Sequence, residues 1–277
     1  MAAAIASAWL PAEARAQAQD AVSAPPPTSA LVQRAFDNLY ADDYIQSLTL
    51  TTRARGGREI SRRLQVTRKQ SVRPSKTLLR FLEPYEIRRT SVLVLENEGE
   101  SDDLYVYLPR VRLTRHLSSA QRKDSFFGTD LSYEDVEPKH AANYDSLRMG
   151  PGSVGGRACE RIDLRARPPY ESTYERQVFC IEVERAVTLS IDFYRNGRVL
   201  KRLEADPQHV TQVGGRYIPF RMTIATPKAR SETLLVTEAY ELRPEVPDEL
   251  FTAWNLESGT ARRDRSRAAG GEAENAR

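Results

Sequence analysis

The chain has 277 residues, of which 40% are hydrophobic and 29% charged, and its formal net charge is only +3. This length allows one large domain or two small ones, the composition suits a soluble globular protein, and the sequence contains no run of 18 apolar residues that would predict a membrane span. Six of the 41 basic residues are lysines and the rest are arginines, which alternate with Asp and Glu along the predicted strands. Because nucleic-acid binding requires a concentrated basic stripe on a recognisable module, we expect no nucleic-acid partner.

The N-terminal residues 1–18 have the small, apolar composition of a truncated signal peptide. Two A-x-A cleavage candidates, Ala14-Arg15-Ala16 and Ala16-Gln17-Ala18, follow the apolar stretch. The positive n-region is missing, so either the start codon is misassigned or the signal is degenerate. No Cys lies near these sites, and we therefore expect a secreted protein without a lipid anchor.

A Pro-rich linker is predicted over residues 19–28 and a folded domain over residues 29–257. Thr28 or Ser29 is the expected cap of an amphipathic helix that ends near Tyr40. Residues 261–277 contain no apolar side chain larger than Ala, and we expect a disordered tail over residues 258–277.

The rest of the domain has the pattern of strands. Glycine pairs at 56–57, 155–156 and 214–215 and the dipeptide Asn196-Gly197 predict hairpin turns. Three alternating runs are each predicted to place one set of apolar side chains on a single face: Val187, Leu189, Ile191 and Phe193; Ile218, Phe220, Met222 and Ile224; Leu234, Val236, Tyr240 and Leu242. Eleven to thirteen strands with one helix indicate a mainly β protein, built as a single curved antiparallel sheet or a barrel.

The two cysteines, Cys159 and Cys180, lie on consecutive predicted strands separated by the turn Pro168-Pro169-Tyr170. Their even number, with no CxxC motif, favours a cross-strand disulfide and an oxidising compartment. Two reduced, buried thiols are the alternative, and two thiols are too few ligands for a structural zinc site.

The segment from Asp103 to Glu137 reads as two short strands followed by an aromatic loop. In that loop Phe126, Phe127, Gly128 and Asp130 are predicted to form a gate or docking loop; the alternative is one aromatic anchored in the core and the other incidental. We expect replacement of both Phe side chains by Ser to weaken loading or docking and to leave the fold intact.

The sequence offers only weak candidates for a catalytic or metal site. Ser125, His116 and Asp130 lack a G-x-S-x-G elbow. Glu134 and Asp135 fit a polar loop or helix cap better than an acid–base pair. His116, His140 and His209 fall on different elements without ligand spacing. We therefore predict no enzyme activity, no cofactor and no metal.

The sequence resembles the outer-membrane lipoprotein-sorting family, which is related to the LolA-like periplasmic carriers. The resemblance covers residues 31–256 and is carried in order by DLYVYLPRVRLTRHL, DSFFGTDLSYEDVE, SIDFYRNGRVLKRLE, GGRYIPFRMTI and VPDELFTAWNL. It implies a single strongly curved sheet that forms an unclosed β-barrel (LolA/LolB-like), with an N-terminal helix and short lid segments over an apolar cavity. It further implies a periplasmic, monomeric carrier of lipoprotein acyl chains or lipid, beside an RND-type inner-membrane exporter, without covalent chemistry.

If this resemblance holds, apolar side chains on one face of the sheet should line the cavity. The predicted lining residues are Leu93, Leu95, Leu104, Val106, Leu189, Ile191, Phe193, Phe220 and Met222. A non-carrying envelope protein with a filled core, which docks to an exporter or assembly machine, is the alternative function.

Overall fold

A computed structural model describes residues 26–54, 56–97, 99–242 and 245–258. The predicted signal peptide (1–18), most of the linker and all but the first residue of the predicted tail lie outside the described residues. The described part contains one 13-stranded antiparallel sheet, a small two-stranded sheet, the helix α2 (Thr28–Tyr40) and the short helix α3 (Ala253–Ser258).

The strands follow the predicted hairpin turns closely. Gly155-Gly156, Asn196-Gly197 and Gly214-Gly215 each connect two paired strands, and all six residues have positive φ angles. In chain order the strands are β1 (Tyr44–Arg53), β2 (Glu59–Lys69), β3 (Lys76–Glu83), β4 (Ser91–Leu95), β5 (Asp103–Leu108), β6 (Leu113–His116), β7 (Tyr144–Val154), β8 (Arg157–Ala166), β9 (Arg176–Glu182), β10 (Val187–Arg195), β11 (Arg198–Ala205), β12 (Val210–Val213), β13 (Arg216–Pro219), β14 (Arg221–Thr226) and β15 (Ser231–Leu242).

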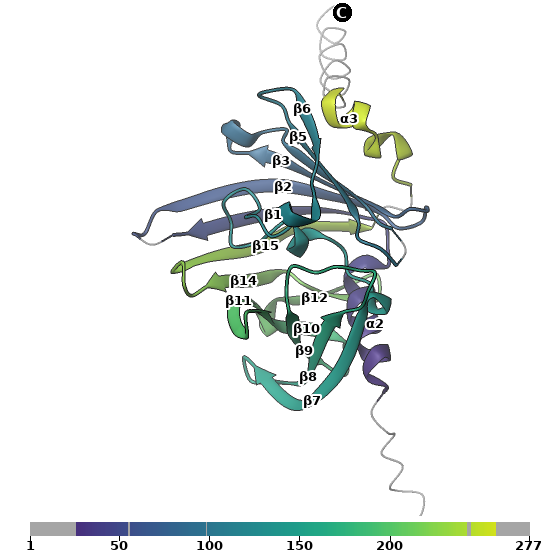
Figure 1. The fold of residues 1–277 in the computed structure, drawn as a ribbon, viewed down its shortest axis with the longest axis vertical. Coiled ribbons are helices and arrows are strands. Elements are labelled where there is room, and N and C mark those ends of the chain that lie inside the picture. Colours follow the sequence, from purple (N-terminus) through teal and green to yellow (C-terminus); the bar gives the residue numbers. More distant parts are fainter. Residues whose placement is uncertain (1–25, 55, 98, 243–244, 259–277) are drawn as a thin grey trace, which may run out of the picture.

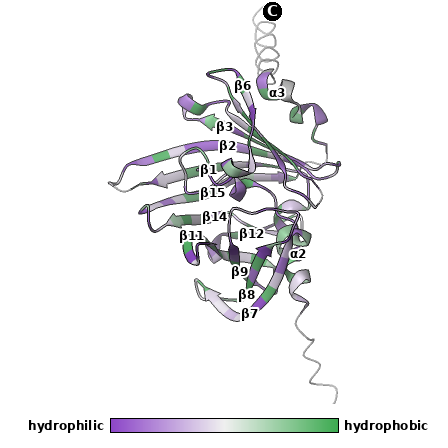
Figure 2. Cartoon of the chain, in the orientation of Figure 1, coloured by the Kyte–Doolittle hydropathy of each residue, from purple (hydrophilic) through white to green (hydrophobic). Residues whose placement is uncertain are grey.

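The large sheet has the order β6-β5-β4-β3-β2-β1-β15-β14-β11-β10-β9-β8-β7. It consists of two meanders, and the last strand, β15, joins them by pairing with both β1 and β14. The edge strands β6 and β7 do not pair with one another, so the curved sheet remains an unclosed barrel, as predicted (Figure 1). Hydrophobic and hydrophilic residues are interspersed along its strands (Figure 2), as expected for a sheet with one face turned to a core.

The connection between β6 and β7 forms a lid over the concave face. Since these strands are the two opposite edges of the sheet, the segment that joins them must cross the open side of the barrel. We call residues 117–143 the lid; it contains three short 3-10 helices, η2 (Ser119–Gln121), η3 (Glu134–Val136) and η4 (Ala141–Asn143). The sequence predicted an aromatic loop here but not a segment that spans the sheet.

Helix α2 packs on the concave side next to the lid. Its buried stripe includes Leu31, Val32, Ala35 and Phe36, and the Phe36 ring lies 5.8 Å from that of Phe179 on β9. The predicted helix limits are confirmed. The predicted cap is wrong, because Pro27 occupies the N-cap position and no side chain caps the helix.

The convex face carries a second cover. The 3-10 helix η6 (Asp248–Phe251) and α3 follow β15 and bring Val246, Phe251 and Leu256 against the outer side chains of β3, β4 and β5. This C-terminal segment accounts for the continuous apolar runs in those strands, which are buried on both faces.

Two β-bulges change the predicted faces of two strands. In β10 the pairing with β9 shifts between Thr188 and Ser190, so Leu189 lies on the outer face while Ile191 and Phe193 lie on the inner face. In β15 the pairing with β1 contains one extra residue, Glu238. Leu234 and Val236, which precede it, therefore lie on the opposite face of the sheet from Tyr240, which follows it. The predicted single faces for these two strands are therefore wrong, because each bulge inserts one extra residue and reverses the alternation.

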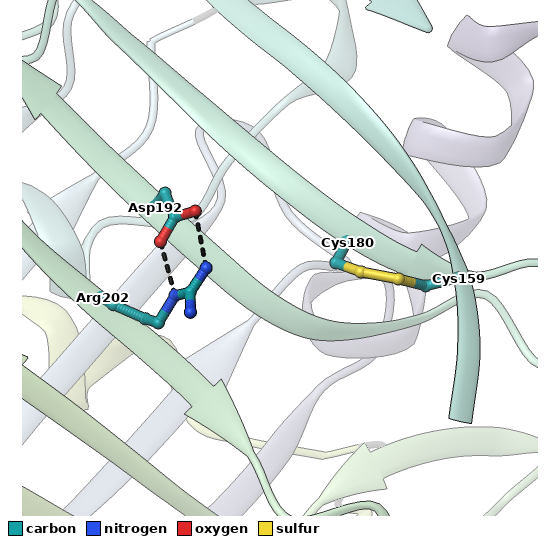
Figure 3. Close-up of a disulfide and its surroundings, with 4 residues drawn as sticks. All are labelled: Cys159, Cys180, Asp192 and Arg202. Atoms are coloured by element: carbon teal, nitrogen blue, oxygen red, sulfur yellow. Dashed lines mark hydrogen bonds and ion pairs between the residues drawn. A yellow bond between two sulfur atoms is a disulfide. The ribbon is translucent and has the colours of Figure 1, made fainter. Parts of the chain in front are cut away.

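Cys159 on β8 and Cys180 on β9 form a disulfide with a Cα–Cα distance of 5.4 Å, as predicted (Figure 3). It lies in a small outer-face cluster with Val187 and Leu189. On the neighbouring strands, Arg202 donates two hydrogen bonds, of 2.6 and 2.9 Å, to the Asp192 carboxylate (Figure 3). The outer face of this half of the barrel is thus covalently and ionically cross-linked.

Candidate functional site

An apolar cavity of about 200 Å³ lies between the concave face of the sheet, helix α2 and the lid. Helix α2, the lid and the central strands of the sheet contribute to its wall. The lining consists of Phe36, Leu39 and Tyr40 from α2; Leu131, Asp135, Val136, Pro138 and Lys139 from the lid; and, from the strands, Tyr44, Gln46, Leu48, Val66, Thr77, Leu79, Phe179, Thr188, Ile191, Phe193, Leu203, Ile218, Pro219, Met222, Leu235 and Tyr240.

The lining is mainly apolar because neighbouring strands place apolar side chains on the inner face. Four of these side chains remain partly exposed: Leu48 on β1, Tyr240 on β15, Met222 on β14 and Leu203 on β11, which are neighbours in the sheet in that order. Large apolar side chains that keep accessible surface inside a fold are the usual lining of a small-molecule site. The curved sheet therefore does not fill its own interior.

Three of the nine predicted lining residues line this cavity: Ile191, Phe193 and Met222. Leu104 and Val106 lie on the same side of the sheet, buried in the main core, but do not reach the cavity. Phe220 lies between β13 and β14, where its ring packs 6.5 Å from that of Tyr240, and is also not part of the lining.

Leu93, Leu95 and Leu189 lie on the opposite, convex side. For β4 the pairing explains this: Val92 is opposite Val106, and Val94 is opposite Leu104. Directly paired residues share a face, so Val92 and Val94, not Leu93 and Leu95, accompany Leu104 and Val106. The bulge in β10 likewise places Leu189 on the convex side of the sheet. Whether any of these residues binds a ligand stays a prediction.

The aromatic loop is anchored, with both rings held in one cluster. Phe126 is fully buried and Phe127 partly so, and their rings contact Phe81 on β3 at 5.5 and 4.7 Å, respectively. Tyr133 completes the cluster from the other side of the loop. Phe127 has a φ of 50° and Gly128 a φ of 76°, which form the tight turn that brings the two rings together. A positive φ is uncommon for a bulky residue, and here the cluster holds it in place.

Acidic side chains fasten the lid to the sheet. Asp130 accepts hydrogen bonds from the hydroxyls of Ser231 and Thr233 on β15, the second at 2.8 Å. Asp135 pairs with Lys201 of β11 and accepts a 2.7 Å hydrogen bond from the Tyr174 hydroxyl.

Glu134 is completely buried and accepts from the Thr173 backbone N–H at 2.8 Å and from the hydroxyls of Ser172 and Thr173. Glu134 and Asp135 were expected in a polar loop or helix cap; in the structure they are buried anchors of the lid.

Three phenolic side chains, Tyr40, Tyr44 and Tyr240, contribute to the polar part of the cavity wall. Burial raises the pKa of Tyr40, and it raises the pKa of Tyr44 to about 12, so both phenols are neutral at physiological pH. Tyr144 and Tyr170, deeper behind the lid, share a hydrogen bond of 3.2 Å.

The lid also brings Lys139 into the cavity wall. Lys139 is only 6% exposed. Sequence reasoning missed this residue, since a single lysine after Pro138 carries no pattern that distinguishes a buried side chain from a solvated one.

The residues considered for catalysis are dispersed. His116 contacts Asp103 at 2.9 Å, Ser125 donates to the Thr129 carbonyl, and Asp130 is held by β15. His140 pairs with Glu96, and His209 with Asp206. Among the described residues we find no cluster of three or more His, Cys, Asp or Glu that could hold a metal, and no helix long and apolar enough to cross a membrane.

A family model described only as that of an uncharacterized protein matches residues 73–258. The chain belongs to this family. A comparison with curated proteins finds no match.

The solved structures that share the fold include three that match 82–83% of this chain. A DUF1329 family protein from Desulfovibrio piger is 24% identical, with a TM-score of 0.75, over 83% of this chain and 99% of that one. A putative outer membrane lipoprotein-sorting protein domain from Vibrio parahaemolyticus is 19% identical, with a TM-score of 0.76, over 83% and 98%. A LolA superfamily protein from Nitrosomonas europaea is 18% identical, with a TM-score of 0.68, over 82% and 98%. The chain therefore has the LolA-like fold, as its sequence resemblance implied.

Proposed function

We propose that this protein is a periplasmic carrier that binds acyl chains of lipoproteins or lipids in its half-barrel and passes them toward the outer membrane without covalent chemistry. The observation that carries the proposal is the apolar cavity between sheet, α2 and lid. Two of the structures of similar fold are named for lipoprotein sorting or the LolA superfamily, which supports the same reading.

The driving force is transfer of an acyl chain from water to the apolar lining. Each buried methylene contributes about 0.8 kcal/mol, so a chain of ordinary length supplies ample affinity without extensive polar recognition. The cavity of about 200 Å³ is smaller than the roughly 300–1,000 Å³ of typical ligand pockets. A full acyl chain would therefore require the lid to move outward.

The lid fits this role because it is anchored by contacts of individual side chains. It is held at the aromatic cluster, at Asp130, at Glu134 and at the buried pair Asp135–Lys201. A loaded form would break some of these contacts and gain apolar contacts with cargo, so the two states would differ by a modest free energy. Release would follow when a partner offers the acyl chain a better site or when the lid returns.

The alternative, a non-carrying envelope protein that docks to an RND-type exporter, requires a core filled by its own side chains. The partly exposed lining residues on β1, β11, β14 and β15 favour the carrier instead. An exporter partner and a monomeric state remain part of the proposal.

Blocking the cavity tests the proposal. Met222→Trp places a larger ring in the lining, while Met149→Trp changes a residue that is 44% exposed on the edge strand β7 and serves as the matched control. Displacement of a fluorescent fatty-acid probe measures acyl-chain binding. Exclusion of two or three methylenes, at about 0.8 kcal/mol each, should weaken binding at least tenfold in Met222→Trp and leave it unchanged in Met149→Trp. Absence of binding to the unaltered protein, or equal binding by both variants, would contradict the carrier function.

A further inference from the structure

One charged group in the cavity wall lacks a partner. The Nζ atom of Lys139 is buried, and no hydrogen-bond acceptor is present for it among the described residues. An ammonium group offers three donors, and burial of a charged donor without a partner is costly. In the same lining, the Thr188 hydroxyl on β10 is also buried without a partner.

The acidic groups near Lys139 are engaged elsewhere. Asp135 is held by Lys201 and Tyr174, and Glu134 by the turn at Ser172 and Thr173. These carboxylates are close enough to act on Lys139 through their charge. Burial lowers the pKa of the Lys139 ammonium, but the electrostatic influence of Tyr170, and after it of Glu134, Tyr40 and Asp135, more than offsets burial, so that the pKa is raised. The ammonium therefore stays charged, although none of the residues that the structure describes accepts a hydrogen bond from it.

The other residues of the lining indicate which ligand could supply the hydrogen-bond acceptor that the Lys139 ammonium lacks. A mainly apolar wall that contains an unpartnered cation, and whose one carboxylate, Asp135, is already paired with Lys201, matches a ligand with one apolar chain and one negative charge. A carboxylate carries that single charge, and its oxygens can accept hydrogen bonds from the ammonium.

We propose that the cavity takes a single-chain carboxylic amphiphile, a free fatty acid, whose carboxylate binds the Lys139 ammonium. This inference rests on the proposed function, since it assumes that the cavity accepts an acyl chain, and it narrows the cargo to an anionic one. A hydrogen bond to a charged group in a buried site should favour the acid over the corresponding alcohol by roughly 10- to 100-fold.

The test compares laurate, dodecanol and a single-chain lysophosphatidic acid in calorimetric titrations at neutral pH. Lys139→Met removes the charge and keeps the length of the side chain, and Lys123→Met, an exposed lysine in the same lid, is the matched control. We expect the unaltered protein and Lys123→Met to prefer laurate to dodecanol at least tenfold, and Lys139→Met to bind the two equally. Retained dodecanol binding by Lys139→Met shows that the variant is folded and its cavity intact.

Each other outcome has a distinct meaning. If neither laurate nor dodecanol binds the unaltered protein, the carrier function itself fails. If both bind with equal affinity, or if Lys139→Met keeps the preference for laurate, acyl binding stands and the role of Lys139 is refuted. If lysophosphatidic acid binds more tightly than laurate and loses that advantage in Lys139→Met, the head group is a phosphate and the carboxylate proposal is overturned.

Discussion

Replacement of Phe126 by Ala should loosen the lid more than any other single change in the aromatic loop. The Phe126 side chain has no exposed surface, and its ring lies 5.5 Å from Phe81, 5.2 Å from Phe127 and 5.6 Å from Tyr133. Truncation of a buried Phe to Ala typically costs about 3–5 kcal/mol, of which each ring pair contributes about 0.5–1.5 kcal/mol beyond its buried area. Since a domain of this kind is stable by only about 5–15 kcal/mol, this loss is a large fraction of the total.

The assay is urea unfolding followed by near-ultraviolet circular dichroism, together with amide hydrogen exchange across the lid. We expect Phe126→Ala to lower the free energy of unfolding by about 3–5 kcal/mol and to speed exchange in the lid. Phe127→Ala should cost about half as much, because that ring is only partly buried. Tyr85→Ala, at a side chain 83% exposed, is the control and should change stability by less than about 0.5 kcal/mol. A Phe126→Ala protein within about 1 kcal/mol of the unaltered one, with unchanged lid exchange, would refute the anchored cluster.

Two further predictions concern the disulfide and a buried acid. The cysteines of the Cys159–Cys180 disulfide are 21 residues apart in sequence, and reduction of this bond should lower the free energy of unfolding by about 3 kcal/mol. The stability of the Cys159→Ala/Cys180→Ala variant should not respond to reductant. Equal stability of the oxidised and reduced forms would contradict this prediction. Burial, with a smaller contribution from the charge of Glu96, raises the pKa of Asp102 to about 6. Because this folded-state pKa exceeds that of an unfolded aspartate, the contribution of Asp102 is most favourable below about pH 4 and is lost as the pH rises through about 6. Asp102→Asn should therefore match the unaltered protein at pH 4 and exceed its stability by about 2–3 kcal/mol at pH 8, and parallel pH profiles of unfolding would contradict the assignment.

The sequence predicted the elements better than their faces. Turn residues such as Asn196-Gly197 determine the hairpins locally, so the strand limits and an antiparallel sheet or barrel could be predicted from the residues. The unclosed barrel was implied by the family resemblance. A β-bulge has no such local signal, and the two bulges at Leu189 and Glu238 therefore reversed the predicted faces of β10 and β15. The inward face of β4 could not be identified from its pattern for another reason. Side chains on both faces of this strand are buried and apolar, and Leu93 is apolar because the C-terminal segment covers it on the convex face.

The site was predicted only in outline. Apolar strands and a resemblance were enough to expect a cavity, and of the nine residues predicted to line it, Ile191, Phe193 and Met222 lie in the wall of the cavity observed. The path of the lid follows from the pairing of strands far apart in sequence, which no local pattern contains. For that reason the anchoring of Phe126 and the burial of Lys139 became visible only in three dimensions. The expectation that both Phe side chains could become Ser with the fold intact is replaced by the loss of stability given above.

Native mass spectrometry of the protein recovered from the periplasm of a Gram-negative host tests the central claim most directly. The carrier account predicts a population heavier than the polypeptide by the mass of an acyl lipid, and loss of that population in Met222→Trp. A protein that carries no lipid, or an adduct that persists equally in Met222→Trp, would contradict a ligand held in the cavity.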